Sequence, residues 1–418
     1  MTVSLDQLPT VGDRRLAVRV TADALRQIRG GSPWLYDGSI TSVSHDGAPG
    51  DLAVVFDDDR KFAAIGLWDP TSPIRVKMLH TGKPTTIDAH WWRERLSTAL
   101  DQRRVLADEA DTTGYRCVHG ENDGLPGLIV DRYGDTLVVK LYTPAWFPHL
   151  RTVVDVLSSL LAPERVVLRL SRGVANGETF GLSDGDTIVG EAPNQPVFFR
   201  ERALTLEADV VHGQKTGHFL DQRDNRALVR GMAAGADVLD VFASTGGFSV
   251  SAAAGGAKSV HLVDQSEPAL ATARRNLEHN HRISEVRRCA VHTTTGDAFQ
   301  VLADLAKKDE LFDIVILDPP TFASNQAAVP RALAAYARLT RLGLAVVKRG
   351  GTLIQASCSS RVTADEFAET VHTAAASAGA DVLETRRTGH AVDHPIGFEF
   401  GAYLKAVYLE VRSTPTRL

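Results

Sequence analysis

The chain has 418 residues, of which 44% are hydrophobic and 23% are charged, and its net charge is −5. These values are typical of a globular protein and exclude a wholly disordered chain, a collagen-like chain and a small disulfide scaffold. A length of this order predicts about three domains. On charge alone a nucleic-acid partner is disfavoured, because proteins that bind nucleic acids commonly carry a basic excess.

The three cysteines, Cys117, Cys289 and Cys358, include no C-x-x-C pair. The sequence therefore predicts neither a disulfide framework nor a metal site, and such sparse cysteines favour a reducing compartment. Residues 1–10 contain no apolar run, which argues against a secretory signal. No stretch approaches the ~20 apolar residues of a membrane helix. We therefore expect a cytoplasmic protein with no membrane partner.

Short strands with turn signals fill the chain from residue 16 to residue 79, and this β-rich unit ends near residue 83. Residues 84–200 follow as a mixture of helices and strands, which predicts an α+β domain. From about residue 235 the pattern changes to alternating strands and helices, which is typical of a parallel sheet covered on both faces. The strands expected in this last part are 237–241, 259–263, 288–292, 314–317, 351–356, 382–385 and 403–411.

A glycine-containing loop joins the strand at 237–241 to the helix that follows it. Gly246 and Gly247 would let a ligand approach the backbone, and the start of the helix offers free N–H groups. The loop is not a G-x-G-x-x-G sequence, because Phe242 and Ser244 occupy positions where a dinucleotide site needs glycine. An NAD enzyme is therefore disfavoured.

Acidic residues follow the next two predicted strands. Asp264 ends the strand at 259–263, and a carboxylate there can accept hydrogen bonds from both ribose hydroxyls. Asp297 follows the strand at 288–292 and could meet an adenine amine. Each acid alone is compatible with an ordinary loop, but their order and spacing together predict a nucleoside-type cofactor. The predicted cofactor residues in this part of the chain are Phe242, Ala243, Gly246, Asp264, Gln265, Asp297 and Asp318.

The strand at 314–317 is buried by its composition and ends in Asp318, Pro319 and Pro320. Because two prolines stop the strand, Asp318 should lie at the carboxyl edge of the sheet, where open α/β folds bind ligands. Its carboxylate could hydrogen-bond the nitrogens of a base, and Phe322 could stack on that base.

Cys358 follows the strand at 351–356, and the topology places it near Asp318. A thiolate is a strong nucleophile where its surroundings activate it. A buried, inert thiol is the commoner state of a free cysteine, but a position after the strand favours a catalytic role. Cys117 and Cys289 lack this position, and we interpret them as structural.

These motifs resemble those of class I S-adenosylmethionine-dependent methyltransferases, through the loop at 240–249, Asp264 and the D-P-P-x-F run at 318–322. Residues 212–226 and the sequences around Cys358 and Asp393 are similar to the ribosomal RNA large-subunit methyltransferase I family. That family forms 5-methylcytosine in large-subunit (23S) ribosomal RNA.

The resemblance extends over nearly the whole chain and implies three domains. Residues 33–38 and 69–74 resemble a PUA domain, a small RNA-binding β-barrel, expected over 1–83. Residues 120–135 resemble the family's central α+β domain, expected over 84–200. Residues 201–418 are expected to form the Rossmann-like methyltransferase domain, with a mostly parallel seven-stranded sheet.

The resemblance also implies partners and roles. The cofactor is S-adenosylmethionine, with Phe219 near its adenine, and the macromolecular partner is large-subunit ribosomal RNA. A homodimer is left open. Cys358 and Asp318 are the implied catalytic residues: the thiolate adds to carbon 6 of cytosine, and the carboxylate holds the ring. The residues expected to touch the substrate are Lys215, Pro319, Pro320 and Phe322.

Alternatives remain open from the sequence. A base N-methyltransferase would use Asp318 without a nucleophile, and residues 318–322 also resemble a guanine-methylating branch. A catalytically idle RNA-binding protein and a small-molecule methyltransferase are less consistent with the combined motifs. Net charge does not decide the matter, because RNA needs only a local basic face. The arginines expected to contribute to such a face are Arg14, Arg15, Arg26, Arg29, Arg202, Arg223 and Arg226.

Overall fold

The computed structural model describes residues 3–12, 14–57, 59–323 and 325–413. Residues 1–2 of the predicted first domain and residues 414–418 of the predicted last domain therefore lie outside the described residues. The chain divides into two compact units. The first comprises Met1–Arg200, Ala208–Leu220 and Val392–Gly401, and the second comprises Glu201–Glu207, Asp221–Ala391 and Ala402–Leu418. The first unit thus includes two short segments of the predicted 201–418 domain, and the three domain bounds stay a prediction.

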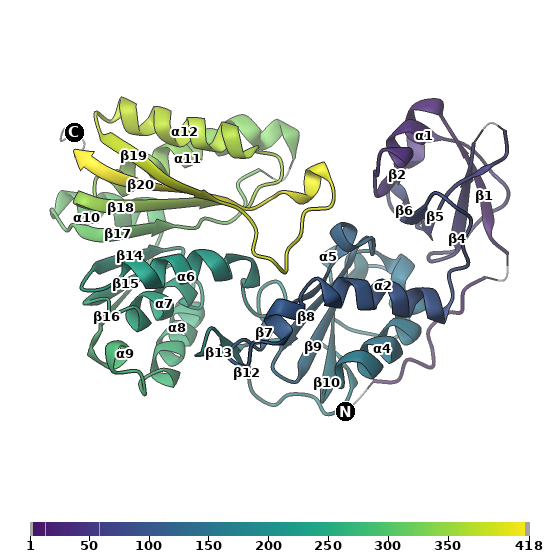
Figure 1. Cartoon of the computed structure of the whole chain (residues 1–418), viewed down its shortest axis with the longest axis horizontal. Coiled ribbons are helices and arrows are strands. Elements are labelled where there is room, and N and C mark those ends of the chain that lie inside the picture. Colours follow the sequence, from purple (N-terminus) through teal and green to yellow (C-terminus); the bar gives the residue numbers. More distant parts are fainter. Residues whose placement is uncertain (1–2, 13, 58, 324, 414–418) are drawn as a thin grey trace. The chain divides into compact units, whose positions relative to one another are not determined.

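A six-stranded sheet with the order β2-β6-β5-β4-β1-β3 forms the N-terminal part of the first unit (Figure 1). Strands β1 and β4 are parallel, and the other neighbours are antiparallel. Thr21 caps helix α1 (Ala22–Arg29), because its hydroxyl accepts a hydrogen bond from the Ala24 amide. The strands are β1 (Leu16–Val20), β2 (Trp34–Tyr36), β3 (Ile40–Val43), β4 (Leu52–Phe56), β5 (Phe62–Trp68) and β6 (Ile74–Thr81).

A five-stranded sheet with the order β11-β10-β9-β8-β7 forms the rest of this unit's core. The alternation along β4 joins the two sheets: Leu52 and Val54 pack into the core of the five-stranded sheet, whereas Ala53 and Val55 pack into the other. The strands are β7 (Gly114–His119), β8 (Leu128–Tyr133), β9 (Thr136–Leu141), β10 (Arg165–Leu170) and β11 (Thr187–Val189). The helices are α2 (Ala89–Asp101), α3 (Arg104–Ala107), α4 (Phe147–Leu161) and α5 (Arg172–Ala175).

A seven-stranded sheet with the order β16-β15-β14-β17-β18-β20-β19 forms the second unit, with helices on both faces (Figure 1). Strands β14 to β18 are parallel, and β20 is antiparallel to both neighbours. The strands are β14 (Asp237–Val241), β15 (Ser259–Asp264), β16 (Ala290–Thr295), β17 (Phe312–Leu317), β18 (Val347–Ser357), β19 (Asp381–Thr388) and β20 (Lys405–Ser413). The helices are α6 (Arg223–Met232), α7 (Gly247–Ala254), α8 (Glu267–His279), α9 (Ser284–Arg288), α10 (Ala298–Lys307), α11 (Val329–Leu344) and α12 (Ala364–Ser377).

The expected Rossmann-like architecture is confirmed, with a mostly parallel sheet of seven strands. One expected strand was shifted: residues 284–288 form helix α9, so β16 begins at Ala290 instead of residue 288. A pair of strands, β12 (Val197–Glu201) and β13 (Leu204–Ala208), precedes this sheet in the chain. No helix in the described ranges has the length and apolarity needed to cross a bilayer. Short 3₁₀ turns occur at Asp37–Ser39, Gly120–Asp123, Pro144–Trp146, Leu220–Gln222, Gln326–Ala328 and Glu399–Gly401.

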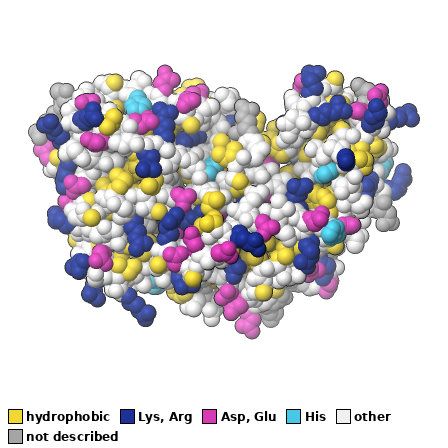
Figure 2. Space-filling view, in the orientation of Figure 1, with side chains coloured by type: hydrophobic (Ala, Val, Ile, Leu, Met, Phe, Trp, Pro, Cys, Tyr) yellow, Lys and Arg dark blue, Asp and Glu magenta, His cyan; other side chains and the backbone are white. Residues whose placement is uncertain are grey.

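Two of the arginines expected to form a basic face are buried, so that part of the expectation is wrong. Arg223 and Arg226 are 1% and 2% exposed, and Arg226 forms an ion pair with the buried Glu201. Arg26 and Arg29 are exposed but each lies within hydrogen-bonding distance of an aspartate. On the face that Figure 2 shows, Lys and Arg are interleaved with Asp and Glu instead of forming one basic patch.

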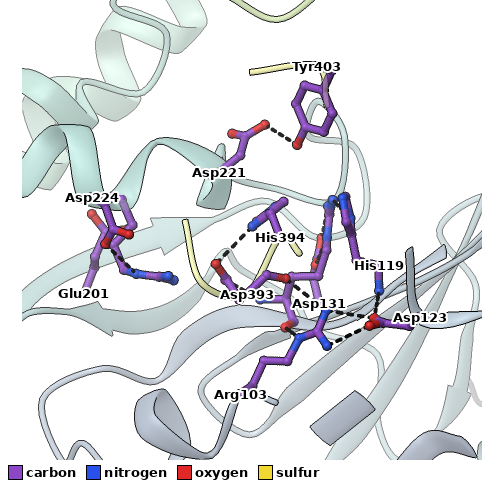
Figure 3. A network of polar contacts seen from close by, with 12 residues as sticks. Arg103, His119, Asp123, Asp131, Glu201, Asp221, Asp224, Asp393, His394 and Tyr403 are labelled. Atoms are coloured by element: carbon purple, nitrogen blue, oxygen red, sulfur yellow. Dashed lines mark hydrogen bonds and ion pairs between the residues drawn. The ribbon is translucent and has the colours of Figure 1, made fainter. Parts of the chain in front are cut away.

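A buried ionic network holds the segment 392–401 in the first unit (Figure 3). The Arg103 guanidinium has no exposed surface and donates two hydrogen bonds to the Asp123 carboxylate, at 2.9 and 2.7 Å. It donates a third to the backbone carbonyl of Asp393, at 3.1 Å. The Asp393 carboxylate accepts from the Arg116 amide and lies 3.0 Å from the His394 ring. Asp393 and His394 thus act in packing the first unit.

We expect the Arg103→Met variant to lose roughly 3–5 kcal/mol of unfolding free energy in this unit, because it leaves the buried Asp123 carboxylate without its cation. All five tryptophans lie within residues 34–146, so tryptophan fluorescence in urea reports on this unit alone. The matched control is Arg151→Met, which breaks an exposed pair with Asp6 and should leave the urea midpoint nearly unchanged. Equal losses in the two variants would contradict the role of the network.

Candidate active site

The carboxyl ends of the parallel strands gather the predicted site residues of the second unit at one edge of its sheet. Asp264 ends β15, Asp297 follows β16, Asp318 follows β17 and Cys358 follows β18. Because neighbouring parallel strands all end at the same edge, residues far apart in sequence become neighbours there. The fold therefore places all four residues at the sheet edge, as their positions in the sequence predicted.

The loop between β14 and α7 has an unusual backbone. Phe242 and Ser244 have positive φ angles of 66° and 49°, in the region that costs side-chain-bearing residues energy, and Gly246 follows at 77°. A Cβ on Gly246 would lie 2.6 Å from the Cβ of Ala273 on α8, so only glycine permits this close packing. Ala243 is held by a hydrogen bond from its amide to the carbonyl of Val263. The loop therefore has one fixed course past the end of β15.

Asp264 is tied to this loop through both of its carboxylate oxygens. Oδ2 accepts a hydrogen bond from the Ser244 amide at 2.8 Å, and Oδ1 accepts one from the Ser266 amide at 2.9 Å. Each carboxylate oxygen can accept a further hydrogen bond, and the side chain is half-buried. Asp264 is thus a fixed acceptor at the strand end, with capacity for two hydroxyl donors.

Gln265 and Asp297 lie beside each other at the next strand end. The Gln265 side-chain amide donates to Asp297 Oδ2 at 3.1 Å, while Asp297 Oδ1 accepts from the Gln300 amide and caps α10. Asp297 therefore has a structural role as a helix cap, which was not expected from the sequence.

Asp240, on β14, is a buried acid that the sequence motifs did not place in the site. Its Oδ2 accepts hydrogen bonds from the amide and hydroxyl of Ser249, at 3.1 and 2.7 Å. Its Oδ1 has no hydrogen-bond partner within the described part of the chain. Burial raises the pKa of this carboxyl to about 6, and the negative charge of Asp264 adds to the effect. A buried acceptor beside the loop is suited to a polar or cationic group of a ligand.

Asp318 and the two prolines occupy the predicted position after β17. Gln222 donates its side-chain amide to Asp318 Oδ1 at 2.9 Å, and this orients the carboxylate. Pro319 is buried and Pro320 exposed. The half-buried Phe322 ring lies 5.0 Å from the ring of Tyr336 and packs against the core, so stacking of Phe322 on a base stays a prediction.

Cys358 differs from the other two cysteines in exposure and in hydrogen bonding. Its Sγ lies 3.1 Å from the Thr321 hydroxyl and 3.8 Å from the carbonyl of Pro319, and its side chain is partly exposed. Cys117 and Cys289 are buried, which raises their thiol pKa values to about 12 and about 11. The interpretation of these two as structural therefore agrees with their burial. The contact with Thr321 was not foreseen.

Lys215 and Phe219 belong to the first unit. The Lys215 ammonium lies 4.3 Å from the centre of the Phe219 ring, a cation–π contact. Their expected contacts with substrate and cofactor stay predictions. In the described ranges, no three His, Cys, Asp or Glu side chains are grouped so that they could hold a metal ion.

Comparisons with known proteins agree with this geometry. A family model described as an S-adenosylmethionine-dependent methyltransferase matches residues 182–400, and a PUA-like domain model matches residues 18–81. A ribosomal RNA large subunit methyltransferase of Deinococcus radiodurans is 44% identical over 408 residues, which are 96% of this chain and 99% of that protein. The ribosomal RNA large subunit methyltransferase I of Pseudoalteromonas translucida is 33% identical, with 94% and 99% covered.

The chain belongs to the ribosomal RNA large subunit methyltransferase I family. The predicted family, the PUA-like domain and the cofactor S-adenosylmethionine are thereby confirmed. Two solved structures share the fold of this family member. One is SMU.776, a methyltransferase in complex with SAH, with a TM-score of 0.80 and 22% identity over 95% of this chain and all of that one. The other, a methyltransferase of Streptococcus mutans, has a TM-score of 0.79 and 21% identity, with 94% and 100% covered.

We expect iodoacetamide at pH 8 to alkylate Cys358 at least ~10-fold faster than Cys117 or Cys289, because their raised thiol pKa values leave very little thiolate at this pH. Peptide mass spectrometry after short exposures measures the three rates, and the same experiment in denaturant provides the control in which they should converge. Equal rates in the folded protein would contradict the assignment of Cys358 as the accessible thiol.

Proposed function

We propose that this methyltransferase forms 5-methylcytosine in large-subunit (23S) ribosomal RNA, with Cys358 as the nucleophile. The observation that carries the proposal is the position of the partly exposed Cys358 thiol. Its Sγ lies 3.8 Å from the carbonyl oxygen of Pro319, the residue that follows Asp318 in the chain. Both residues follow parallel strands at the edge that also carries Asp264. The relatives are named for large-subunit ribosomal RNA, which supports the choice of substrate.

The residues at the strand ends suit S-adenosylmethionine. Asp264 would accept the ribose hydroxyls, and Asp297 with Gln265 would lie toward the base. Phe242, Ala243 and Gly246 would line the cofactor through the fixed loop. The unpartnered Oδ1 of Asp240 offers a buried acceptor for a cationic group. When bound, the cofactor supplies an electrophilic methyl group on a sulfonium.

The chain's own residues would prepare the cytosine. Carbon 5 of cytosine is a weak nucleophile. Addition of Cys358 Sγ to carbon 6 forms a carbon–sulfur bond and moves the electron pair of the C5=C6 double bond toward carbon 5, which can then accept the methyl group. Asp318 would hold the ring along its N3 edge. After the transfer, the carbon 5 proton passes to a general base, the double bond re-forms, and Cys358 leaves as a thiolate.

The PUA-like domain and the remaining substrate residues would position the RNA. Residues 18–81 match the PUA-like model, and the exposed Arg14 and Arg15 lie just before them. Lys215, Pro319, Pro320 and Phe322 are proposed to touch the nucleotide. We further propose a cytoplasmic location, in keeping with three free cysteines, and three domains at 1–83, 84–200 and 201–418. A homodimer is a proposal that sedimentation velocity tests.

We expect Asp264→Ala to weaken S-adenosylmethionine binding by at least about tenfold, because the variant loses the charged acceptor proposed for two hydroxyls. Isothermal titration calorimetry measures the dissociation constant. The matched control is Asp304→Ala on α10, which removes a partly exposed aspartate paired with Lys307 and should leave the constant unchanged. Unaltered binding in the Asp264 variant would contradict the proposed ribose site.

We expect Cys358→Ala to abolish 5-methylcytosine formation, with a loss of at least ~1,000-fold, because the thiolate addition is removed. Nucleoside mass spectrometry of ribosomal RNA from gene-deleted cells, complemented with the wild-type or variant gene, measures the product. Calorimetry should show that the variant still binds S-adenosylmethionine.

The control for this experiment is Cys289→Ala, at a buried thiol directly before β16 and so at the opposite end of that strand from the proposed site. It should restore methylation to the wild-type level. Full activity of Cys358→Ala would favour an N-methyltransferase that uses Asp318 alone, on a guanine or another base. Unchanged 5-methylcytosine on deletion of the gene would contradict the substrate, and absence of cofactor binding would favour an RNA-binding protein without catalysis.

A further inference from the structure

Lys405 is a buried lysine that the proposed mechanism does not use. It is the first residue of β20 and pairs with Ser357, the last residue of β18, in the antiparallel ladder. Its exposed fraction is 6%. Because Cys358 is the residue after Ser357, the register places Lys405 beside the point where the chain turns into the proposed nucleophile.

The Lys405 ammonium is held by the backbone around this turn. It donates hydrogen bonds to the carbonyls of Ser359 and Val362, and to that of Tyr403 at 3.1 Å. Burying an ammonium is costly unless its donors are satisfied, and here three carbonyls satisfy the three donors. Two of these carbonyls belong to the turn directly after Cys358. The lysine therefore fixes the course of that turn. All three of these acceptors are neutral carbonyl oxygens, and none is a carboxylate.

The charge of Lys405 is also coupled to the thiol. Burial lowers the pKa of Lys405 to about 8, while the charges of Cys358 and Glu366 act in the opposite direction. Coupling of two ionisations is reciprocal, so a cation that the thiolate stabilises must itself stabilise the thiolate. At neutral pH the lysine is mostly protonated and can exert this effect.

Other groups of the described chain near the thiol are an acid, a phenol, a hydroxyl and an exposed arginine. Asp318 follows β17, and Tyr336 lies on α11. Burial raises the pKa of Tyr336 to about 12, and the charges of Cys358 and Asp318 add to this effect. The Thr321 hydroxyl is a neutral partner of Sγ at 3.1 Å. Arg361 lies in the same turn, and its side chain is exposed to solvent.

We propose that Lys405 is a positioning residue for the methyltransferase reaction, which fixes the turn at 358–362 and favours the ionised form of the Cys358 thiol. This inference rests on the proposed function for its catalytic meaning, but its effect on the thiol is measurable without turnover. It assigns the electrostatic activation of the nucleophile to a residue on β20, which lies 47 positions further along the chain.

The first test is Lys405→Met, which removes the charge and keeps the length of the side chain. We expect the thiol pKa of Cys358, measured from the pH dependence of its alkylation rate by peptide mass spectrometry, to rise by about one unit. The alkylation rate of Cys358 at pH 7 should fall roughly tenfold in this variant. Arg361→Met removes an exposed cation from the same turn and should leave the thiol pKa unchanged. An unchanged thiol pKa in folded Lys405→Met would overturn the proposal.

A reciprocal test covers the case in which Lys405→Met does not fold. In Cys358→Ser the loss of the thiolate should lower the pKa of Lys405, measured by competitive labelling with acetic anhydride across pH. No difference from the wild type would overturn the proposal. The outcomes also separate the two hypotheses: if Lys405→Met shifts the thiol pKa but Cys358→Ala keeps full methylation, the activation stands and the nucleophilic mechanism fails.

Discussion

The parallel course of β14 to β18 is the constraint on which the site depends. Each strand enters the sheet from the same side and ends at the same edge, so the residues after the strands converge whatever their separation in the chain. Asp264, Asp318 and Cys358 are brought to this edge by topology alone. Strand β20, which runs antiparallel to both of its neighbours, matters equally, because it begins where β18 ends. That reversal is what places Lys405 beside the turn after Cys358.

The same constraint explains which parts of the site could be predicted from the sequence. The local sequence predicts that Asp318 lies at the sheet edge, because two prolines follow it and stop the strand. It predicts the same for Cys358, because this cysteine comes directly after a strand. Lys405 carries no such signal, because a lysine at the start of a strand is ordinarily a surface residue. Its role depends on which strand neighbours β18, and the sequence pattern predicted a strand near residues 403–411 without predicting its partner. The contact of Thr321 with Cys358 was missed for another reason: it depends on the course of the loop after Pro320, which the neighbouring strand ends do not fix.

Cysteines and aspartates of this protein differ in chemical role according to how deeply they are buried. Cys117 and Cys289 are held as neutral thiols by apolar surroundings, whereas Cys358 lies at a partly exposed edge with a hydroxyl and a cation nearby. Asp240 and Asp264 divide in a similar way: burial raises the pKa of the first, and backbone amides hold the second as an acceptor. The residue type shows what chemistry is available, and the surroundings select the member that performs it.

The net charge of −5 does not show which charges are exposed on the surface of the protein. Arg226 looked like a candidate for a basic face, yet it is buried against Glu201, and Arg103 is buried against Asp123. Each such pair contributes nothing to the net charge and no cation to the surface, while breaking it would leave a costly buried charge. Buried arginines of this kind are not available for contact with RNA phosphates. A chain with an acidic balance is fully compatible with an RNA substrate, because attraction over short distances is set by local charge and not by the sum.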